Sequence, residues 1–316
     1  MKARHLVRRA ADATFAAPAW AATAQGPGAG FRRWSIVDET TGAAHTGFGV
    51  CELDPGRSLP AHVHSFEQSL YLLEGSAVLD TGEGSFALDE GDYGVVPVAV
   101  PHAWRNPGDN VARWADMQSP QPRSRHHDDT YLCGSSRAPE PQLGGGAPVR
   151  VDVRDPRTRS FGHISPANLD QHKQSQDLLA VSASMRTALL VYSGITVKPM
   201  VDSDLGAQLQ TMFMVQYALD GVAGAHDHPF EETYLILEGA TDASFDGERY
   251  RLEVGDVAWA GVGCVHSFAN AGDGPVRWLE TQAPQPPARH SYRFARDWEY
   301  LAALASQQDA SGEETR

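Results

Sequence analysis

Two groups of histidines repeat along this chain with a constant spacing between the copies. The equivalent pairs are His62 and His226, His64 and His228, and His102 and His266, and each pair is 164 positions apart. The turn glycines Gly75 and Gly239 keep the same offset, and so do Trp114 and Trp278. A repeat that keeps glycines and histidines together indicates that one structural unit was duplicated with its site.

The second copy of the repeat has the residue types of a transition-metal site. His226, His228 and Glu232 share parity, so an extended strand would point their side chains to one face. His266 would arrive from a later strand. Three imidazoles and one carboxylate that converge can hold a divalent transition metal and leave positions for a substrate or oxygen. Ordinary hydrogen-bonded histidines are the alternative, but a duplicated set of three favours the metal site.

The first copy differs at one ligand position, because Gln68 stands where the second copy has Glu232. A dication held by three histidines and a neutral amide keeps more uncompensated charge, so it should bind more weakly. Three histidines can still hold zinc, nickel or copper, so the sequence leaves the occupancy open. Glu67 has the wrong strand parity to replace the missing carboxylate. The second candidate site consists of His62, His64, Gln68 and His102.

The composition is that of a globular protein rich in turns. The 316 residues suffice for two domains with their own cores, and 41% are hydrophobic and 21% charged. Thirty glycines and twenty prolines accompany short alternating runs, such as residues 69–73 and 76–80, which predict β-strands. We therefore expect an all-β fold with a few short helices.

Composition and the position of the repeat divide the chain into five segments. Ser165 and Pro166 could cap and open a short helix that runs towards Leu179. A second helix is expected near the C-terminus, ahead of a polar tail. The segments are an N-terminal arm at 1–35, the first repeat at 36–120, a connector at 121–185, the second repeat at 186–294, and the helix with its tail at 295–316.

Charge and cysteine content restrict the partners of the protein. The net charge of -14 argues against a nucleic-acid backbone or an anionic membrane surface as a partner. No apolar run is long enough to span a membrane. Three cysteines without a CxxC pair indicate reduced thiols in a cytoplasmic protein. A homodimer through exposed sheet edges and the arm is compatible with this organisation, and the expected ligand is a small molecule.

The spacing of these residues resembles the two motifs of the cupin superfamily. Gly261 stands where the second motif has proline, and Gly221 is one residue closer to the histidines than in the first motif. Neither departure touches a ligand. The first copy departs at Gln68 and at Ala99, where the motif has glycine. The second copy reads His226-x-His228-x3-Glu232-x6-Gly239, and then Gly255-x5-Gly261-x-Gly263-x2-His266-x3-Asn270.

The resemblance implies two tandem cupin barrels, each a double-stranded β-helix or jelly roll, and hence a bicupin. In cupins a metal lies inside the mouth of the barrel, bound by those four motif positions. The resemblance therefore implies one divalent ion (iron, manganese, nickel, copper or zinc) in the C-terminal barrel. Its ligands would be His226, His228, Glu232 and His266.

Apolar residues near the motif could form the walls of a substrate pocket. Such residues are more often part of a barrel core than of a substrate pocket. No arginine falls close to the ligand run on its inward face, which argues against oxalate as the substrate. Arg251 and Arg277 are expected on outer strand faces. The candidate wall residues are Met214, Tyr234, Trp259 and Phe268.

Three functions follow from these observations. The first is a metal-dependent oxygenase, similar to quercetinase-type dioxygenases, which acts on a chelating carbonyl or enol compound with Glu232 as ligand or base. The second is a non-redox hydrolase or lyase similar to ureidoglycine aminohydrolase, whose bicupin layout agrees but whose ligand order differs. The third is a metal-stabilised protein that binds a small molecule. We rank an enzyme above a binding protein, and the oxygenase first.

Overall fold

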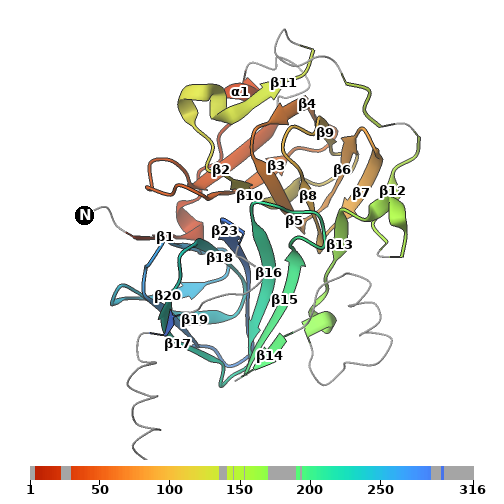
Figure 1. Ribbon diagram of the computed structural model, residues 1–316. Coiled ribbons are helices and arrows are strands. Elements are labelled where there is room, and N and C mark those ends of the chain that lie inside the picture. Colours follow the sequence, from red (N-terminus) through yellow and green to blue (C-terminus); the bar gives the residue numbers. More distant parts are fainter. Residues whose placement is uncertain are drawn as a thin grey trace, which may run out of the picture.

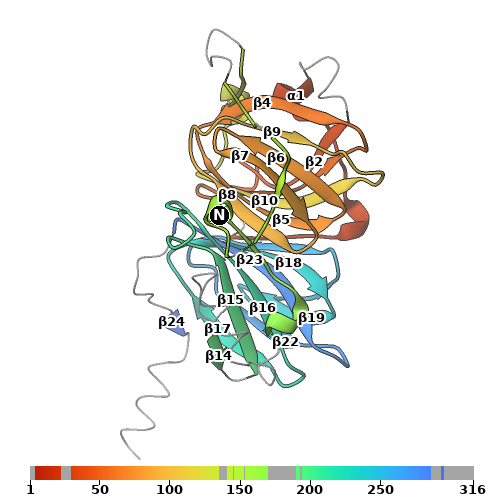
Figure 2. The ribbon, with the colours of Figure 1, turned by 90° about the vertical axis from the view of Figure 1, so that its right-hand side faces the viewer.

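The computed structural model describes residues 4–22, 30–134, 141–144, 146–152, 154–169, 190–192, 194–285 and 293–294. Two β-barrels lie one above the other, the first built from the red to yellow part of the chain and the second from the green to blue part (Figures 1 and 2). The expected all-β fold with two tandem barrels is confirmed. Among the described residues, no helix has the length and apolarity to cross a membrane.

The N-terminal barrel is formed by two six-stranded sheets. In order across the first sheet, its strands are β13 (Phe161–His163), β8 (Asp92–Val96), β5 (Glu67–Glu74), β10 (Ala112–Ser119), β3 (Gly47–Leu53) and β2 (Phe31–Val37). Across the second sheet, they are β11 (Thr130–Leu132), β4 (Ser58–His64), β9 (His102–Arg105), β6 (Ser76–Thr81), β7 (Gly84–Asp89) and β12 (Val149–Arg150). The pairings are antiparallel except that of β12 with β7.

The C-terminal barrel has a seven-stranded and a five-stranded sheet, with antiparallel pairing throughout the described strands. The larger sheet contains β1 (His5–Arg8), β21 (Val257–Ala260), β18 (Glu231–Glu238), β23 (Val276–Ala283), β16 (Thr211–Tyr217), β15 (Ile195–Val201) and β14 (Leu190–Tyr192). The smaller sheet contains β20 (Glu248–Glu253), β19 (Ala240–Phe245), β22 (His266–Asn270), β17 (Val222–Asp227) and β24 (Arg293–Phe294).

The described helices are short and lie in the arm and the connector. At Ser165, where we expected a longer helix, the structure has a single 3-10 turn, and residues 170–189 lie outside the described part. The helix expected after residue 295 also lies outside it. The helical elements are η1 (Ala10–Asp12), α1 (Ala19–Ala22), η2 (Ser124–Asp129), η3 (Pro156–Thr158) and η4 (Pro166–Leu169).

The arm and the connector each extend a sheet. Strand β1 pairs with β21, so the beginning of the chain joins the barrel built from its end. Strand β13 of the connector pairs with β8 of the N-terminal barrel. Each addition covers a strand edge that would otherwise expose unpaired backbone groups.

The strands at the centre of the molecule are buried on both faces, because their side chains point alternately into their own barrel and towards the other barrel. In β18, Tyr234 and Ile236 point into the C-terminal barrel, while Leu235 joins the cluster between the barrels. In β10, Trp114 and Met117 divide in the same way between the N-terminal core and that cluster. Because side chains alternate along a strand, one face packs the barrel and the other packs the neighbouring barrel.

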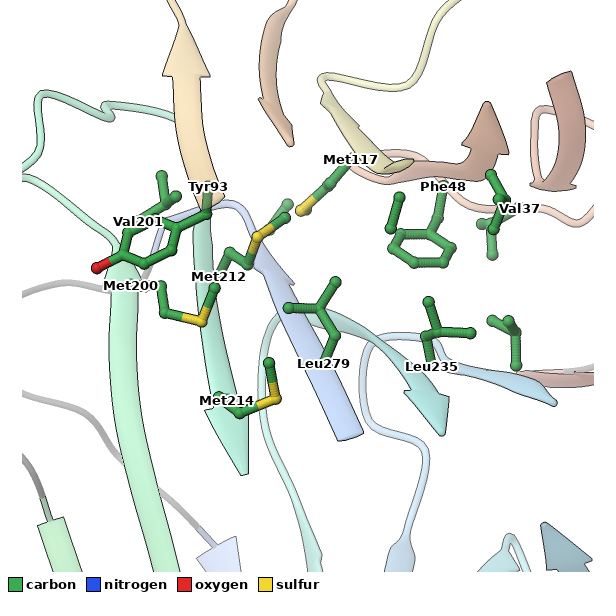
Figure 3. Packing of buried hydrophobic residues seen from close by; sticks show 14 of the residues in the cluster. Val37, Phe48, Tyr93, Met117, Met200, Val201, Met212, Met214, Leu235 and Leu279 are labelled. Carbon is green, nitrogen blue, oxygen red and sulfur yellow. The ribbon is translucent and has the colours of Figure 1, made fainter. Parts of the chain in front are cut away.

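The cluster between the barrels is apolar and rich in methionine (Figure 3). Met117 and Phe48 from the N-terminal barrel lie opposite Met212, Leu235 and Leu279 from the C-terminal barrel. All five side chains are 3% exposed or less. This continuous core holds the two barrels together by burial of apolar surface.

Two glutamates fix the interface at equivalent places. Glu231 accepts hydrogen bonds from the backbone N–H groups of Ala44 (2.8 Å), His45 (3.1 Å) and Thr46 (3.0 Å). Glu67 accepts those of Gln208 (2.7 Å) and Leu209 (3.2 Å). Each glutamate precedes a ligand position of its own barrel and reaches the other barrel. The parity that excluded Glu67 from the first site is thus what directs it across the interface.

Candidate metal centre

The two sheets of the C-terminal barrel each contribute to one cluster of ligands. His226 lies near the end of β17, directly opposite His266 at the start of β22. His228 follows β17, and Glu232 is the second residue of β18, in the other sheet. The sequence suggested one extended strand for the first three, but the chain turns at 228–230. The residues still converge because the turn carries the chain from one sheet to the other.

Each imidazole is oriented by a bond to the backbone. The Nδ1 atoms of His226, His228 and His266 donate to the carbonyl oxygens of Gly224 (2.7 Å), Phe230 (3.1 Å) and Cys264 (2.9 Å). A carbonyl can only accept, so Nδ1 carries the proton and Nε2 is left for a ligand role. One nitrogen from each ring lies within 4.8 Å of the others. His266 Nε2 is buried and makes no hydrogen bond.

The Glu232 carboxylate completes the cluster. Its Oε2 atom lies 2.7 Å from His228 Nε2 and 3.4 Å from His266 Nε2. The Tyr234 hydroxyl donates to the same oxygen, and Gln282 Nε2 donates to Oε1 at 2.5 Å. Both oxygens of the carboxylate are therefore held in place by neighbouring side chains.

The electrostatics of the cluster suit a cation. Burial alone would raise the pKa of Glu232, but His228 and His266 hold that pKa well below its ordinary value. Burial lowers the pKa of His228, but Glu232 more than offsets this and leaves it raised. An ionised carboxylate at 2% exposure needs a positive partner at the centre of the three rings. A divalent transition metal fits this donor set and supplies that charge.

A cavity of about 580 Å³ opens onto the cluster. His226, Glu232 and His266 lie in its wall, together with Tyr234 and Phe268 of the expected pocket residues. The remaining lining includes aliphatic and aromatic side chains from β15, β16 and β23, among them Val197, Phe213, Val215, Tyr217 and Trp278. Its size is that of a pocket for a substantial organic ligand.

Met214 and Trp259, which we expected as pocket walls, lie elsewhere. Both belong to the cluster between the barrels. Met214 alternates with Phe213 and Val215, which line the cavity, so its side chain leaves the opposite face of β16. Trp259 is paired with Thr233, whose parity is opposite to that of Glu232 and Tyr234. The prediction that these two residues line the pocket is therefore wrong, because their side chains leave the opposite faces of their strands.

Sequence reasoning did not identify Glu280 as part of the site. Glu280 is 8% exposed, lies in the cavity wall and accepts a hydrogen bond from Trp278 Nε1 at 2.8 Å. Burial and the nearby Glu232 raise the pKa of Glu280 well above its ordinary value. The signal was present in the repeat, since Asp116 and Glu280 are equivalent acidic positions.

The histidines of the N-terminal barrel adopt nearly the same arrangement. The ring centroids are 4.1 Å apart for His62 and His102, and 4.9 Å for His64 and His102. The corresponding distances in the second barrel are 4.4 and 4.9 Å. Burial lowers the pKa of His64 to about 3 and that of His102 to about 4. However, the nitrogens of this set are not among the described donor groups that meet within 4.8 Å.

Gln68, at the fourth position of the first site, forms a hydrogen bond with a neighbouring acidic side chain. Gln68 Nε2 donates to Asp116 Oδ2 at 2.9 Å, and its buried Oε1 has no hydrogen-bond partner. The Nε2 atoms of His64 and His102 are also buried without a partner. These three buried atoms could act as neutral metal ligands. The first site has no counterpart of the negative charge that Glu232 contributes to the second.

The N-terminal arm covers the first site. The indole of Trp20, in α1, packs on the ring of His62 with centroids 4.9 Å apart, and α1 also contacts η2 and β11. His62 is 3% exposed, whereas His226 faces a cavity. Of the two histidine sets, the one in the second barrel is therefore the set whose described residues line the cavity.

Comparison with known proteins identifies the family. A family model described as a cupin domain matches residues 49–117 and 213–281. The tetracenomycin polyketide synthase protein TcmJ of Streptomyces glaucescens is 32% identical over 119 residues, which are 37% of this chain and 80% of that protein. Polyketide synthase CurC of Streptomyces cyaneus is 29% identical over 89 residues, which are 28% of this chain and 58% of that protein.

Two solved structures have the same two-barrel arrangement. Oxalate decarboxylase of Lactobacillus farciminis superposes with a TM-score of 0.60 at 16% identity, over 93% of this chain and 89% of the other. A mutant salicylate 1,2-dioxygenase of Pseudoaminobacter salicylatoxidans gives 0.56 at 15% identity, over 76% and 71%. With two matched domains and a histidine set in each barrel, the chain is a bicupin and belongs to the cupin superfamily.

Proposed function

We propose that the protein is a metal-dependent oxygenase whose C-terminal barrel binds an organic carbonyl or enol substrate. The observation that supports this is the cluster of three imidazoles and Glu232, of which His226, His266 and Glu232 lie in the wall of a large, mostly apolar cavity. The relatives named for polyketide synthases support the same class of substrate. Polyketides are rich in carbonyl groups that form enols, and a metal chelates such groups readily.

Each residue of the site has a distinct task in this proposal. His226, His228, His266 and Glu232 would hold iron, manganese, nickel, copper or zinc. The bound ion would polarise the chelating oxygens, and iron, manganese, nickel or copper would also support redox chemistry with dioxygen, which zinc does not. The Glu232 carboxylate would also accept a proton from the substrate. Tyr234 and Gln282 fix its two oxygens by donating hydrogen bonds to them. The aromatic walls exclude water from the activated carbon.

A second function, a non-redox lyase or hydrolase reaction, is favoured by Glu280. Its carboxyl lies in the cavity wall next to Glu232. Two neighbouring carboxyls can take up and return a proton on the same substrate without any change of oxidation state. The oxygenase ranks first because the cavity is larger and more apolar than a small hydrolysable substrate requires.

Oxygen consumption separates the two functions. Protein purified without added metal would first be analysed for its metals, and we expect about one ion per chain. Flavonols and β-diketones would then be offered in an oxygen electrode. The oxygenase predicts uptake that matches substrate loss and is abolished in Glu232→Gln, because the site loses its charge. The equivalent control, Gln68→Ala, should retain uptake.

The opposite outcomes are equally clear. Product that forms anaerobically, without oxygen uptake in air, contradicts the oxygenase and supports the lyase or hydrolase. Near two ions per chain would mean that the site with Gln68 is also occupied. A preparation that keeps full activity after chelator treatment would contradict both functions.

A further inference from the structure

Both barrel interiors contain a buried acidic residue at an equivalent position, but the residue that stands beside it differs between the two barrels. In the N-terminal barrel, Asp116 is 1% exposed and forms an ion pair with Arg33 at 2.9 Å. The repeat places Val197 at the position of Arg33 and Glu280 at that of Asp116. The acid is therefore kept in both barrels, but its cation is present only in the first.

The space for this cation depends on a glycine. A Cβ atom on Gly49 would lie 2.5 Å from Arg33 Cζ, so only glycine lets the guanidinium cross the neighbouring strand. The equivalent position in the second barrel is Phe213, which lines the cavity beside Val197. The second barrel thus has valine in place of the cation and an aromatic side chain in place of the glycine.

The charged groups in the described lining of the C-terminal cavity are all acidic, apart from its imidazoles. Among the described lining residues, these are Asp202, Glu232 and Glu280, and none is lysine or arginine. Lys198, whose charge reaches Asp202, follows Val197 and leaves the opposite face of β15. Arg251 and Arg277 are also absent from the lining, as expected for outer strand faces.

This charge distribution limits what a ligand may carry. A divalent ion with Glu232 and three neutral imidazoles retains one net positive charge, which a single enolate or phenolate oxygen balances. A second anionic group would lie among apolar walls and carboxyls, where no described lining residue is a lysine or arginine that could compensate its charge, and its desolvation would oppose binding. This holds for either protonation state of Glu280, because neither state attracts an anion.

The walls favour a flat, uncharged body. Trp278 lies 4.6 Å from Tyr217 and 5.3 Å from Phe268 between ring centroids, and Phe268 lies 4.7 Å from Tyr234. These rings form a continuous aromatic surface along the cavity. Conjugated ring systems stack on such surfaces in offset or edge-on geometry.

We propose that the C-terminal cavity selects a chelating enol or hydroxy-ketone on an uncharged aromatic body. Because Val197 stands where the first barrel has Arg33, the cavity would exclude substrates that carry a second anionic group. The inference deepens the proposed function, because it rests on a metal held by the same site. It concerns binding, however, and does not depend on whether the reaction consumes oxygen.

The first test compares two probes that differ by one charge. Binding of 3-hydroxyflavone and of its 4′-carboxylate to zinc-loaded protein would be measured under argon by quenching of tryptophan fluorescence. Zinc is redox-inert, so the probes are not turned over. We expect the carboxylate to bind at least about tenfold more weakly, because its charge is buried without a partner. Equal affinities, or tighter binding of the carboxylate, would overturn the proposal.

The second test transfers the cation from one barrel to the other. Val197→Arg with Phe213→Gly copies the arrangement of Arg33 and Gly49, and Val197→Met with Phe213→Gly is the control of similar size. The first variant should lose most of the discrimination, and the control should keep it. The same preference in both variants would contradict a role for this position.

A variant at the surface keeps the proposal testable if the double variants at Val197 and Phe213 do not fold. Val222 lies at the rim of the cavity and is 55% exposed, so Val222→Lys should fold and Val222→Gln is its control. Only the lysine variant should narrow the difference between the probes. Discrimination without oxygen uptake would end the oxygenase assignment alone, whereas uptake without discrimination would end this inference alone.

Discussion

Gln68 and Glu232 stand at equivalent positions, but the residues around them have changed as well. Gln68 Nε2 donates to Asp116, whereas Glu232 receives a hydrogen bond from Gln282. Gln118, the equivalent of Gln282, donates to Asp116 instead, at 3.1 Å. The single change Gln68→Glu would give this barrel the pair of carboxyls that Glu232 and Glu280 form in the other. Because Gln118 donates to Asp116 and not to position 68, the change would not by itself recreate the second site.

At this scale, Gln282 is a positioning residue for the metal ligand. Gln282→Leu removes the donor to Glu232 Oε1 and lets the carboxylate rotate, so we expect metal affinity to fall about 10–100-fold. Competition with a chromophoric chelator measures this affinity. The equivalent change Gln118→Leu touches no ligand of the C-terminal site and should leave its affinity unchanged. Equal losses in both variants would show a general effect on folding.

At the scale of elements, the connector joins the N-terminal barrel through a strand with an ion pair. His163 in β13 and Asp92 in β8 are backbone partners, and His163 Nδ1 lies 2.9 Å from Asp92 Oδ1. The hydrogen bond that His163 donates to Asp92 raises the pKa of His163 above its ordinary value, although burial opposes this. Docking of β13 is thus strengthened by protonation.

The sign of the pH dependence follows from this shift. A raised folded-state pKa stabilises the protein below the ordinary histidine value of about 6.5, and the effect is lost as pH rises through the folded value. His163→Gln should therefore destabilise more at pH ~5.5 than at pH ~8.5, by under about 1 kcal/mol because the ring is half exposed. Urea unfolding at both pH values measures this, and in an Asp92→Asn background the difference should vanish.

At the scale of the whole molecule, the two barrels share one apolar core and two glutamate contacts. Glu67 and Glu231 each lie next to a ligand position and accept backbone N–H groups from the opposite barrel. The ligand strands β5 and β18 are therefore anchored to the partner barrel. Such an arrangement predicts that the barrels unfold together.

Removal of one contact should weaken the whole protein. Glu67→Ala leaves the partly buried N–H groups of Gln208 and Leu209 without their charged acceptor, and we expect the free energy of unfolding to fall by about 1–3 kcal/mol. Chemical denaturation followed by fluorescence measures it. The exposed Asp273→Ala is the control, with a change within about 0.5 kcal/mol. Unfolding of one barrel alone would contradict the shared core.

The repeat indicated a duplicated unit with its site, and its resemblance to the cupin motifs predicted the two barrels and the residues that meet in each. Spacing and parity brought together His226, His228, Glu232 and His266, although the chain reaches them through two sheets and a turn. Ala99 illustrates how strong this pattern is, because it adopts a φ of 62° where its equivalent Gly263 has 71°. Local geometry is encoded in residue order, so a duplicated motif carries it faithfully.

Only the tertiary structure decided which histidine set lines a cavity and which one is covered. Trp20 reaches His62 from the arm, and Arg33 reaches Asp116 over Gly49, through contacts between residues far apart in the chain. Met214 and Trp259 pack between the barrels because both faces of the central strands are buried. Parity tells which residues share a face, but hydrophobicity cannot tell a barrel interior from an interface when both are apolar.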